Sequence, residues 1–400
     1  MKAYFTLQSG ESFSGKWLCS PSGAQGGVVQ GEVVCYIGAG GYEHVLTNPL
    51  YRGQIVVFTY PLVGNYGFPL PKRERDRVTV AGVVVSDYCT FPSAPDGTAT
   101  LADVLAADGV PALYGVDTRA VAASLRGQAS VYGAFGLASG AESVARMATA
   151  GSARTDVHAL QHADVGKAVT YAGAADAAHL VVLDFGCVQP LVTRLRAAGY
   201  RLTIVPYHWS APRILAVKAD GIVLSDGPGD PRNVWARAAS LPSLATKLPM
   251  FGFGLGYHVA ALALGATTTR YPSPFRGMRQ PVVHIASGRV HHVVHHSRYI
   301  VAKQSLAAAH WKVTQVSTDG QIVFACEHRD YPLYGVQCQP HASEPHVPLS
   351  QQLQYGKLSP ESRQAGDAWH AVELWPPYCE QMWHSFAERV NVVRKESVYA

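Results

Sequence analysis

The stretch that decides the fold of the second half of the chain reads PMFGFGLGYHVAAL and covers residues 249–262. The apolar run 249–253 predicts a buried strand, and the residues after Gly256 predict a helix. Alternating glycines between a strand and a helix are typical of a nucleophile elbow, whose central residue is held in strained backbone geometry at the edge of a sheet. The central residue of this elbow is Gly254.

Strands and helices alternate on the N-terminal side of the elbow. Mostly apolar runs at 179–185, 201–206 and 221–225 predict further buried strands, and the segments 190–198, 214–219 and 234–239 predict helices between them. This order predicts a parallel, doubly wound sheet in the second half of the chain.

The first 147 residues have a different character. Short strands, clearest at 28–37, 54–60 and 78–85, are broken by glycine and proline turns, and 100–107 and 119–126 predict short helices. Residues 148–178 are rich in Ala, Gly, Ser, Thr and Asp, which fits a linker. We therefore expect an α/β protein with a β-rich N-terminal domain at 1–147, a linker at 148–178 and a doubly wound domain at 179–400.

The composition excludes several classes of protein. Hydrophobic residues make up 48% of the 400 residues and charged residues 15%, which excludes a disordered or coiled-coil chain. The net charge of +5 is not concentrated in one run, so we predict no nucleic-acid partner. The uncharged stretch 248–269 contains four glycines, and we interpret it as strand, turn and helix rather than as a membrane span.

The seven cysteines form no CxxC pair and no zinc spacing, which indicates free thiols in a reducing compartment. We therefore expect no metal and no cofactor. The first residues alternate like a strand and resemble neither a signal peptide nor a transit peptide. The expected location is intracellular, in the cytoplasm or the mitochondrial matrix.

Two further segments resemble a known family when they are taken together with the elbow. They read LSDGPGDP, residues 224–231, and YGVQCQPHA, residues 334–342, and each follows a strand into a turn. In this order the three segments resemble class I glutamine amidotransferase domains. The segments GEVV (31–34), YRGQI (51–55), YPLVGNYG (60–67), GVDTR (115–119) and LDFG (183–186) narrow the resemblance to the small subunit of carbamoyl-phosphate synthetase. It spans roughly residues 2–342.

The resemblance implies a reaction for which this chain lacks the residues. Members of the family hydrolyse glutamine through a cysteine thioester and pass ammonia to a larger partner; the thiolate needs a histidine that a carboxylate orients. The cysteine position falls on Gly254, the histidine position on Gln339 and the glutamate position on His341. Glycine has no nucleophile, and glutamine cannot act as a general base. We therefore predict no catalytic residue.

The positions of the former glutamine pocket have also changed. The pocket serine falls on Leu50, the glutamine after the elbow on His258, and a small glycine on Arg298. His296 is changed as well, whereas Gly227, Gly229 and Leu255 keep the residues of the family. The positions of the former pocket are therefore Leu50, Gly227, Gly229, Leu255, His258, His296 and Arg298.

Two alternatives concern a new chemistry at the old site. Gly254 either persists because strand and helix must still join, which we favour, or opens a pocket for another ligand. Cys338 neighbours Gln339, but successive residues of a strand point to opposite faces, so we expect a buried and inert thiol.

Four histidines, His291, His292, His295 and His296, raise the question of a metal site. On a strand His291 and His295 would share one face and the other two the opposite face, and no cysteine or carboxylate lies close in sequence. A polar strand surface or a protein contact is the favoured interpretation.

These observations predict a non-catalytic pseudo-glutaminase that acts as a structural or regulatory subunit of a larger protein assembly. The alternative is the small subunit of an ammonia-dependent carbamoyl-phosphate synthetase, which would support carbamoyl-phosphate formation for pyrimidine or arginine synthesis. A repurposed enzyme is the least favoured hypothesis. We expect the partner, which under the alternative is a synthetase large subunit, to contact the segments 291–298 and 343–377. The segment 343–377, with Trp369 and Trp375, is either a solvated loop with aromatic anchors or a segment that docks on that partner.

Overall fold

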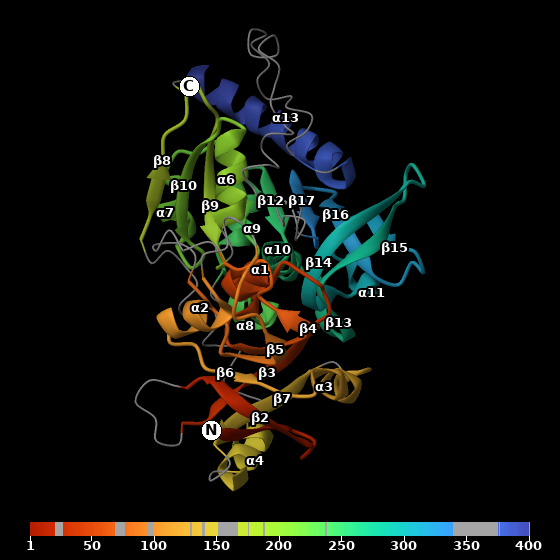
Figure 1. The fold of residues 1–400 in the computed structure, drawn as a ribbon. Helices are drawn as coiled ribbons and strands as arrows, with labels where there is room; N and C mark the ends of the chain where they lie inside the picture. The colour runs from red at the N-terminus through yellow and green to blue at the C-terminus, as the bar shows by residue number, and fades with distance from the viewer. Residues whose placement is uncertain are drawn as a thin grey trace. The chain divides into compact units, whose positions relative to one another are not determined.

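The computed structural model describes most of the chain, in twelve stretches. They are residues 1–20, 27–68, 77–93, 99–128, 130–137, 141–150, 167–174, 176–186, 189–236, 238–338, 375 and 377–399. The chain divides into two compact units, Met1–Ala159 and Leu160–Ala400. In Figure 1 the first unit is red to yellow and the second runs from yellow-green to blue.

Unit 1 is built on a closed barrel with the strand order β1-β2-β6-β5-β4-β3-β7. The barrel closes because β7 pairs with both β1 and β3. The three ladders that join β3, β4, β5 and β6 are parallel. Its strands are β1 (Lys2–Leu7), β2 (Ser12–Cys19), β3 (Val29–Tyr36), β4 (Gln54–Val63), β5 (Gly82–Tyr88), β6 (Ala112–Tyr114) and β7 (Val131–Leu137). Its helices are α1 (Tyr42–Thr47), η1 (Pro49–Tyr51), α2 (Leu101–Ala107), α3 (Thr118–Leu125) and α4 (Ala141–Ala150).

Alternate residues of the barrel strands belong to two different cores. On β4, Ile55 and Val57 pack with residues of β1 and β7, whereas Val56 and Phe58 pack with residues of α1 and α2. This period of two follows from the alternating direction of side chains along a strand. The β-rich N-terminal domain predicted from the sequence is therefore present.

Unit 2 is built on a ten-stranded sheet with the order β14-β13-β15-β16-β17-β12-β11-β9-β10-β8. Its strands are β8 (Val169–Tyr171), β9 (His179–Asp184), β10 (Arg201–Pro206), β11 (Gly221–Leu224), β12 (Met250–Phe253), β13 (Thr268–His284), β14 (Val290–Val301), β15 (Trp311–Ser317), β16 (Val323–His328) and β17 (Leu333–Val336). Its helices are α6 (Gln189–Ala197), α7 (Ala211–Leu215), α8 (Pro231–Trp235), α9 (Leu241–Ala245), α10 (Leu255–Ala263), α11 (Lys303–Leu306) and α13 (Pro377–Tyr399).

Helices cover both faces of the central strands (Figure 1). Residues of α6 and α13 pack in one apolar cluster, and residues of α7, α8, α9 and α10 pack in another on the opposite face. The doubly wound architecture is therefore as predicted. The sheet is parallel only from β17 to β10, however, because β13–β16 and β8 pair antiparallel with their neighbours.

Several boundaries differ from those that the sequence predicted, among them those of β5, which spans Gly82–Tyr88 rather than 78–85. Helix α7 begins at Ala211 rather than 214, and α8 begins at Pro231 rather than 234; each has a proline at one of its first two positions, where the missing N–H costs nothing. Strand β8 lies inside the stretch 148–178 and pairs with β10 at the edge of the sheet.

Some predicted features lie outside the described residues. They include Gln339, His341, Trp369 and all of 343–374. Among the helices that the structure describes, none is both long and apolar enough to span a membrane.

Candidate functional site

The predicted elbow is present in unit 2. Strand β12 ends at Phe253, α10 begins at Leu255, and Gly254 between them has φ 49° and ψ −113°. A residue with a side chain is strained in this backbone conformation, whereas glycine adopts it at little cost. The junction therefore keeps the geometry of an elbow with a glycine at its tip.

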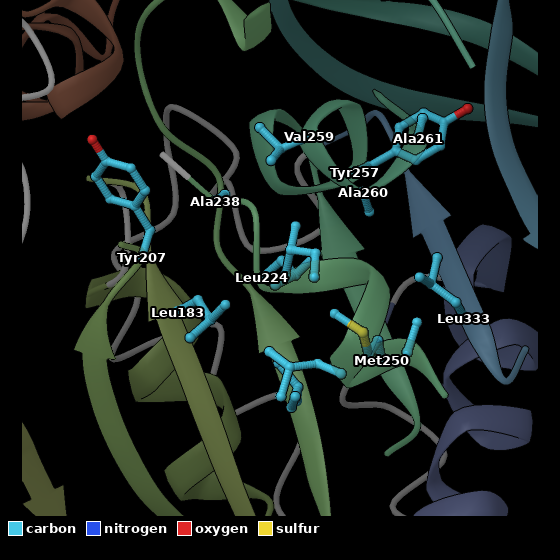
Figure 2. Packing of buried hydrophobic residues seen from close by; sticks show 14 of the residues in the cluster. Leu183, Tyr207, Leu224, Ala238, Met250, Tyr257, Val259, Ala260, Ala261 and Leu333 are labelled. Atoms are coloured by element: carbon cyan, nitrogen blue, oxygen red, sulfur yellow. The ribbon is translucent and has the colours of Figure 1, made fainter. Parts of the chain in front are cut away.

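The base of the elbow is packed too closely for any side chain at two glycines. A Cβ on Gly227 would lie 1.8 Å from the carbonyl oxygen of Phe185, and a Cβ on Gly256 would lie 2.6 Å from Leu224 Cβ. Below these glycines, Leu224 and residues of α10 such as Tyr257 belong to one buried apolar cluster (Figure 2). The helix therefore sits directly on the strands, as an elbow requires.

The tip of the elbow is occupied by an aspartate that the sequence interpretation did not single out. A Cβ on Gly254 would lie 2.1 Å from Asp226 Oδ1 and 2.3 Å from its Cγ. Asp226 is 2% exposed, and no real Cβ approaches another heavy atom so closely. A side chain at position 254, a cysteine included, therefore has no room while the Asp226 carboxylate keeps this position.

The same carboxylate oxygen accepts two backbone hydrogen bonds. The N–H of Leu255 donates to Asp226 Oδ1 at 2.8 Å, and the N–H of Gly227 donates to it at 2.8 Å. In elbow enzymes the N–H that follows the nucleophile is one of the donors that stabilise the developing oxyanion. In this chain both donors already hold an oxygen of the chain itself.

Polar residues of the loop that carries Asp226 bond to the loop itself and to neighbouring segments. The Ser225 hydroxyl accepts a hydrogen bond from the N–H of Phe185 at 2.9 Å and donates one to the Asp226 carbonyl at 2.8 Å. Asp230 caps α8 and forms an ion pair with Arg232 at 2.6 Å. Burial raises the pKa of Asp230, but hydrogen bonds from Arg232 and its charge outweigh burial and leave that pKa below its usual value.

Three histidines are buried at or close to the former pocket positions. His258 of α10 is 2% exposed, His295 of β14 is 0% exposed, and His296 is 9% exposed. Burial lowers the pKa of His258 to about 4, although Gln337 and the charge of Asp230 act in the opposite direction. Burial, together with the charges of His258 and His296, holds the pKa of His295 well below its usual range. At neutral pH His258 and His295 are therefore uncharged.

The burial of these histidines corrects the prediction of a polar strand surface. Strict alternation would place His295 and His296 on opposite faces, one of them open to a partner. The ladder between β13 and β14 shifts register between Arg276 and Met278, which pair with His296 and His295. The extra residue of this bulge lies in β13, so His295 and His296 remain successive residues of β14, and their burial shows that both faces of the strand are covered there. Only His291 and His292 of the four remain partly or fully exposed.

The remaining residues of the predicted site belong to three different segments of the chain. Leu50, in η1 of unit 1, is 5% exposed. Gly229 has φ 104° and lies in the turn before α8. Arg298 is half-buried, with its guanidinium carbon 5.9 Å from the ring centroid of Tyr299. Among the described residues no group of three or more His, Cys, Asp or Glu is arranged to hold a metal ion.

Two residues near the C-terminus turn inward. Cys338 is buried, and burial raises the pKa of its thiol to about 12. Trp375 is 4% exposed and stacks on Phe253 of β12, with 5.2 Å between the ring centroids. Of the two interpretations of this segment, contact of Trp375 with a partner is therefore wrong, whereas its burial agrees with an aromatic anchor, because its ring is part of a core cluster of unit 2.

The position of Asp226 in the sequence is the only feature that could have pointed to it as a residue of the site. An acidic residue stands between the end of β11 and the glycine turn, at the point where the loop meets the elbow. Carboxylates are common in turns, so this position alone does not distinguish a turn residue from an occupant of the site.

Comparison with known families matches each unit to its own description. The model "Carbamoyl-phosphate synthase small chain, CPSase domain" matches residues 5–135, and "Glutamine amidotransferase class-I" matches residues 181–346. The second match contains the elbow and the whole loop 224–231. Unit 2 is therefore a domain of the class I glutamine amidotransferase type, and the predicted fold class is confirmed.

Curated relatives extend the match over both units. A protein from Symbiobacterium thermophilum described as "Carbamoyl phosphate synthase small chain" is 37% identical over 84% of this chain and 92% of its own length. Proteins with the same description from Listeria monocytogenes and Archaeoglobus fulgidus are 36% and 34% identical, over 78% and 86% of this chain and 85% and 94% of their own lengths. The chain belongs to the carbamoyl-phosphate synthase small chain family.

Proposed function

We propose that this chain is the small subunit of a carbamoyl-phosphate synthase and that it pairs with a large chain without hydrolysing glutamine. The large chain would then take free ammonia. Family membership supports the pairing, because relatives named as small chains match both units rather than the amidotransferase domain alone.

One observation carries the proposed loss of glutaminase activity: the tip of the elbow is Gly254, and the Asp226 carboxylate occupies the space of the missing side chain. An acyl-transfer reaction of this type needs a nucleophile at the elbow and free N–H donors for the oxyanion. The proposed catalytic vacancy also includes Gln339 and His341, which take the positions of the base and its carboxylate by resemblance to the family.

The former glutamine pocket gives further support. By resemblance to the family a glutamine stands at the position of His258, and this histidine is buried and uncharged at neutral pH. The imidazole therefore changes the shape and the hydrogen-bonding groups of the pocket. We therefore propose that the pocket no longer binds glutamine.

A structural or regulatory subunit of a different assembly is the second candidate. The observation in its favour is the segment 347–400, which extends past the amidotransferase match at residue 346 and ends in the long helix α13. The two candidates share the loss of glutaminase activity and differ only in the partner. The relatives reported above come from bacteria and an archaeon, so the cytoplasm is the location that we propose.

The test is co-purification from the native source, followed by assays of the complex. We expect a carbamoyl-phosphate synthase large chain to elute with this chain and to form carbamoyl phosphate with ammonium but not with glutamine. The large chain alone is the control, and we expect the small chain to increase its activity or stability. A complex without a large chain would favour the second candidate. Glutamine-dependent synthesis would contradict the proposed loss of glutaminase activity.

A further inference from the structure

The Asp226 carboxylate is buried, and the absence of a cysteine at the elbow does not explain why an acidic residue lies there. A vacant elbow could have kept a small apolar residue beside Gly254, yet an acidic side chain lies there with 2% exposure. Burying a carboxylate is costly unless hydrogen bonds or charges compensate for the lost water. Part of that compensation comes from the elbow itself.

Two backbone donors from separate segments supply that compensation. One is the N–H of Gly227, in the turn after β11, and the other is the N–H of Leu255, the first residue of α10. Helix α10 has nine residues, so its positive N-terminal end also favours an anion at this point. Both donors converge on one oxygen, Oδ1, as donors converge on the oxyanion of a substrate.

We propose that Asp226 is a built-in substitute for a bound substrate oxyanion, which fills the anion cradle of the elbow and holds the site closed. The carboxylate and Gly254 depend on each other, because the carboxylate occupies the volume that a side chain at 254 would need. Asp226 is thus a positioning residue that ties β11 to the start of α10. The inference concerns the same elbow as the proposed function and rests on the loss of its nucleophile, but not on any partner.

A latent ligand site follows from this arrangement. Without the Asp226 side chain, the N–H groups of Gly227 and Leu255 lose their acceptor inside a buried space of about the size of a carboxylate. The chemical class that fits both the donors and the volume is a small monocarboxylate, such as formate or acetate.

Chemical rescue tests the inference. Asp226→Ala should lower the thermal unfolding midpoint by about 5 °C, because two buried N–H groups lose their acceptor. Formate should raise the midpoint of this variant in a saturable manner, whereas formamide, which is neutral and of similar size, should raise it much less. On the native chain, neither additive should raise the midpoint as much as formate raises that of Asp226→Ala. In Asp226→Asn the amide oxygen remains as an acceptor for the two N–H groups, so formate should have no effect on the midpoint of this variant.

Several results would overturn the inference. They are an Asp226→Ala variant as stable as the native chain, a formate effect no larger than that of formamide, and an equal formate effect on the native chain. If the variant is recovered unfolded, the same comparison is made on the yield of protein refolded in formate or in formamide.

A double-mutant cycle tests the dependence between the two residues. Gly254→Ala should lower the midpoint strongly in the native background, because its Cβ would lie 2.1 Å from Asp226 Oδ1. In the Asp226→Ala background the same change should lower it distinctly less, since only backbone strain remains. Additive effects of the two changes would contradict the inference. Because all readouts are stabilities of the chain alone, failure here leaves the proposed partner and ammonia dependence untouched.

Discussion

The elbow in unit 2 has two parts that differ: the base, which is the close packing at Gly227 and Gly256, and the tip, which is Gly254. At the base, Gly227 and Gly256 still allow contacts that no other residue would permit, and α10 still packs on the strands. At the tip, the position that carries the nucleophile by resemblance to the family is Gly254, and the proposed occupant of the anion cradle is the Asp226 carboxylate. The difference teaches that the packing and the chemistry of such a junction are held by different atoms and can be lost separately.

The free energies involved explain why the base persists. A Cβ at the base would press on backbone or core atoms, and overpacking of this kind costs about 1–3 kcal/mol or more. That is a large part of the stability of an ordinary domain. A change at the tip removes chemistry but leaves the core intact.

The largest expected effect is the failure to rebuild the enzyme at the tip. Gly254→Cys combined with Gln339→His and His341→Glu should form no glutamate from glutamine above the uncatalysed rate. The new side chain would meet the Asp226 carboxylate, and the family positions of the pocket, Leu50 among them, would still be changed. Release of glutamate and ammonia, measured over hours, checks this expectation.

Adding Asp226→Ala to that triple variant separates the two obstacles. Activity that appears only after this fourth change would show that Asp226 was the main block and that the pocket had survived. Efficient turnover by the triple variant itself would mean that the tip of the elbow is not closed at all.

At the base, Gly227→Ala should cost more than about 3 kcal/mol in the free energy of unfolding. Its Cβ would lie 1.8 Å from the backbone oxygen of Phe185, and a backbone atom cannot move away as a flexible side chain can. The matched control is Gly288→Ala, at a glycine with φ 66° and open space around it, where only the left-handed backbone penalty of about 1–2 kcal/mol applies. Urea unfolding measures both. Equal losses would show that the base is no more constrained than a surface turn.

Much of the base could be predicted from the sequence, because glycines at fixed spacing between an apolar strand and a helix leave few alternatives. The tip could be predicted only as a vacancy at Gly254. That Asp226 fills the vacancy depends on how β11 and β12 pair side by side, with Leu224 opposite Gly252. Residues 28 positions apart in the sequence meet there, and no local pattern reports such a meeting.

The histidines and Trp375 were misjudged for related reasons. Alternation along β14 predicts the face to which each histidine points but not whether that face is covered, and both His295 and His296 are buried. Trp375 belongs to a stretch that reads as polar and rich in proline, but its ring contacts Trp383 of α13 as well as Phe253. In each case a long-range contact decides burial, and sequence spacing does not contain it.

A further expected effect, of about 3 kcal/mol, is a loss of stability in acid. Burial lowers the pKa of His258 to about 4, below the ordinary value of about 6.5 that it has in the unfolded chain. The unfolded chain therefore binds more protons between these values, so this contribution is complete above about pH 6.5 and is lost as the pH falls towards 4. His295 acts in the same direction. Urea unfolding at a series of pH values between 7.5 and 4 measures the loss.

His258→Gln should make the free energy of unfolding fall less steeply over that range, whatever it costs at pH 7.5. The control is the native chain, unfolded over the same series of pH values. An unchanged slope in His258→Gln would contradict the assignment of a neutral, buried histidine to the former pocket.

The smallest expected effect is the absence of reaction at Cys338. This thiol lies close to the elbow, so its reactivity tests whether a nucleophile is available there. Burial raises its pKa to about 12, and the charge of Asp226 contributes to the increase. At pH 8 only about one thiol in 10⁴ is then a thiolate, the form that reacts. Iodoacetamide should therefore modify the half-buried Cys89 in the native protein and leave Cys338 unmodified until the chain unfolds, as peptide mass spectrometry would detect. Rapid native labelling of Cys338 would instead identify a reactive thiol close to the elbow and would contradict the interpretation of this residue as buried and inert.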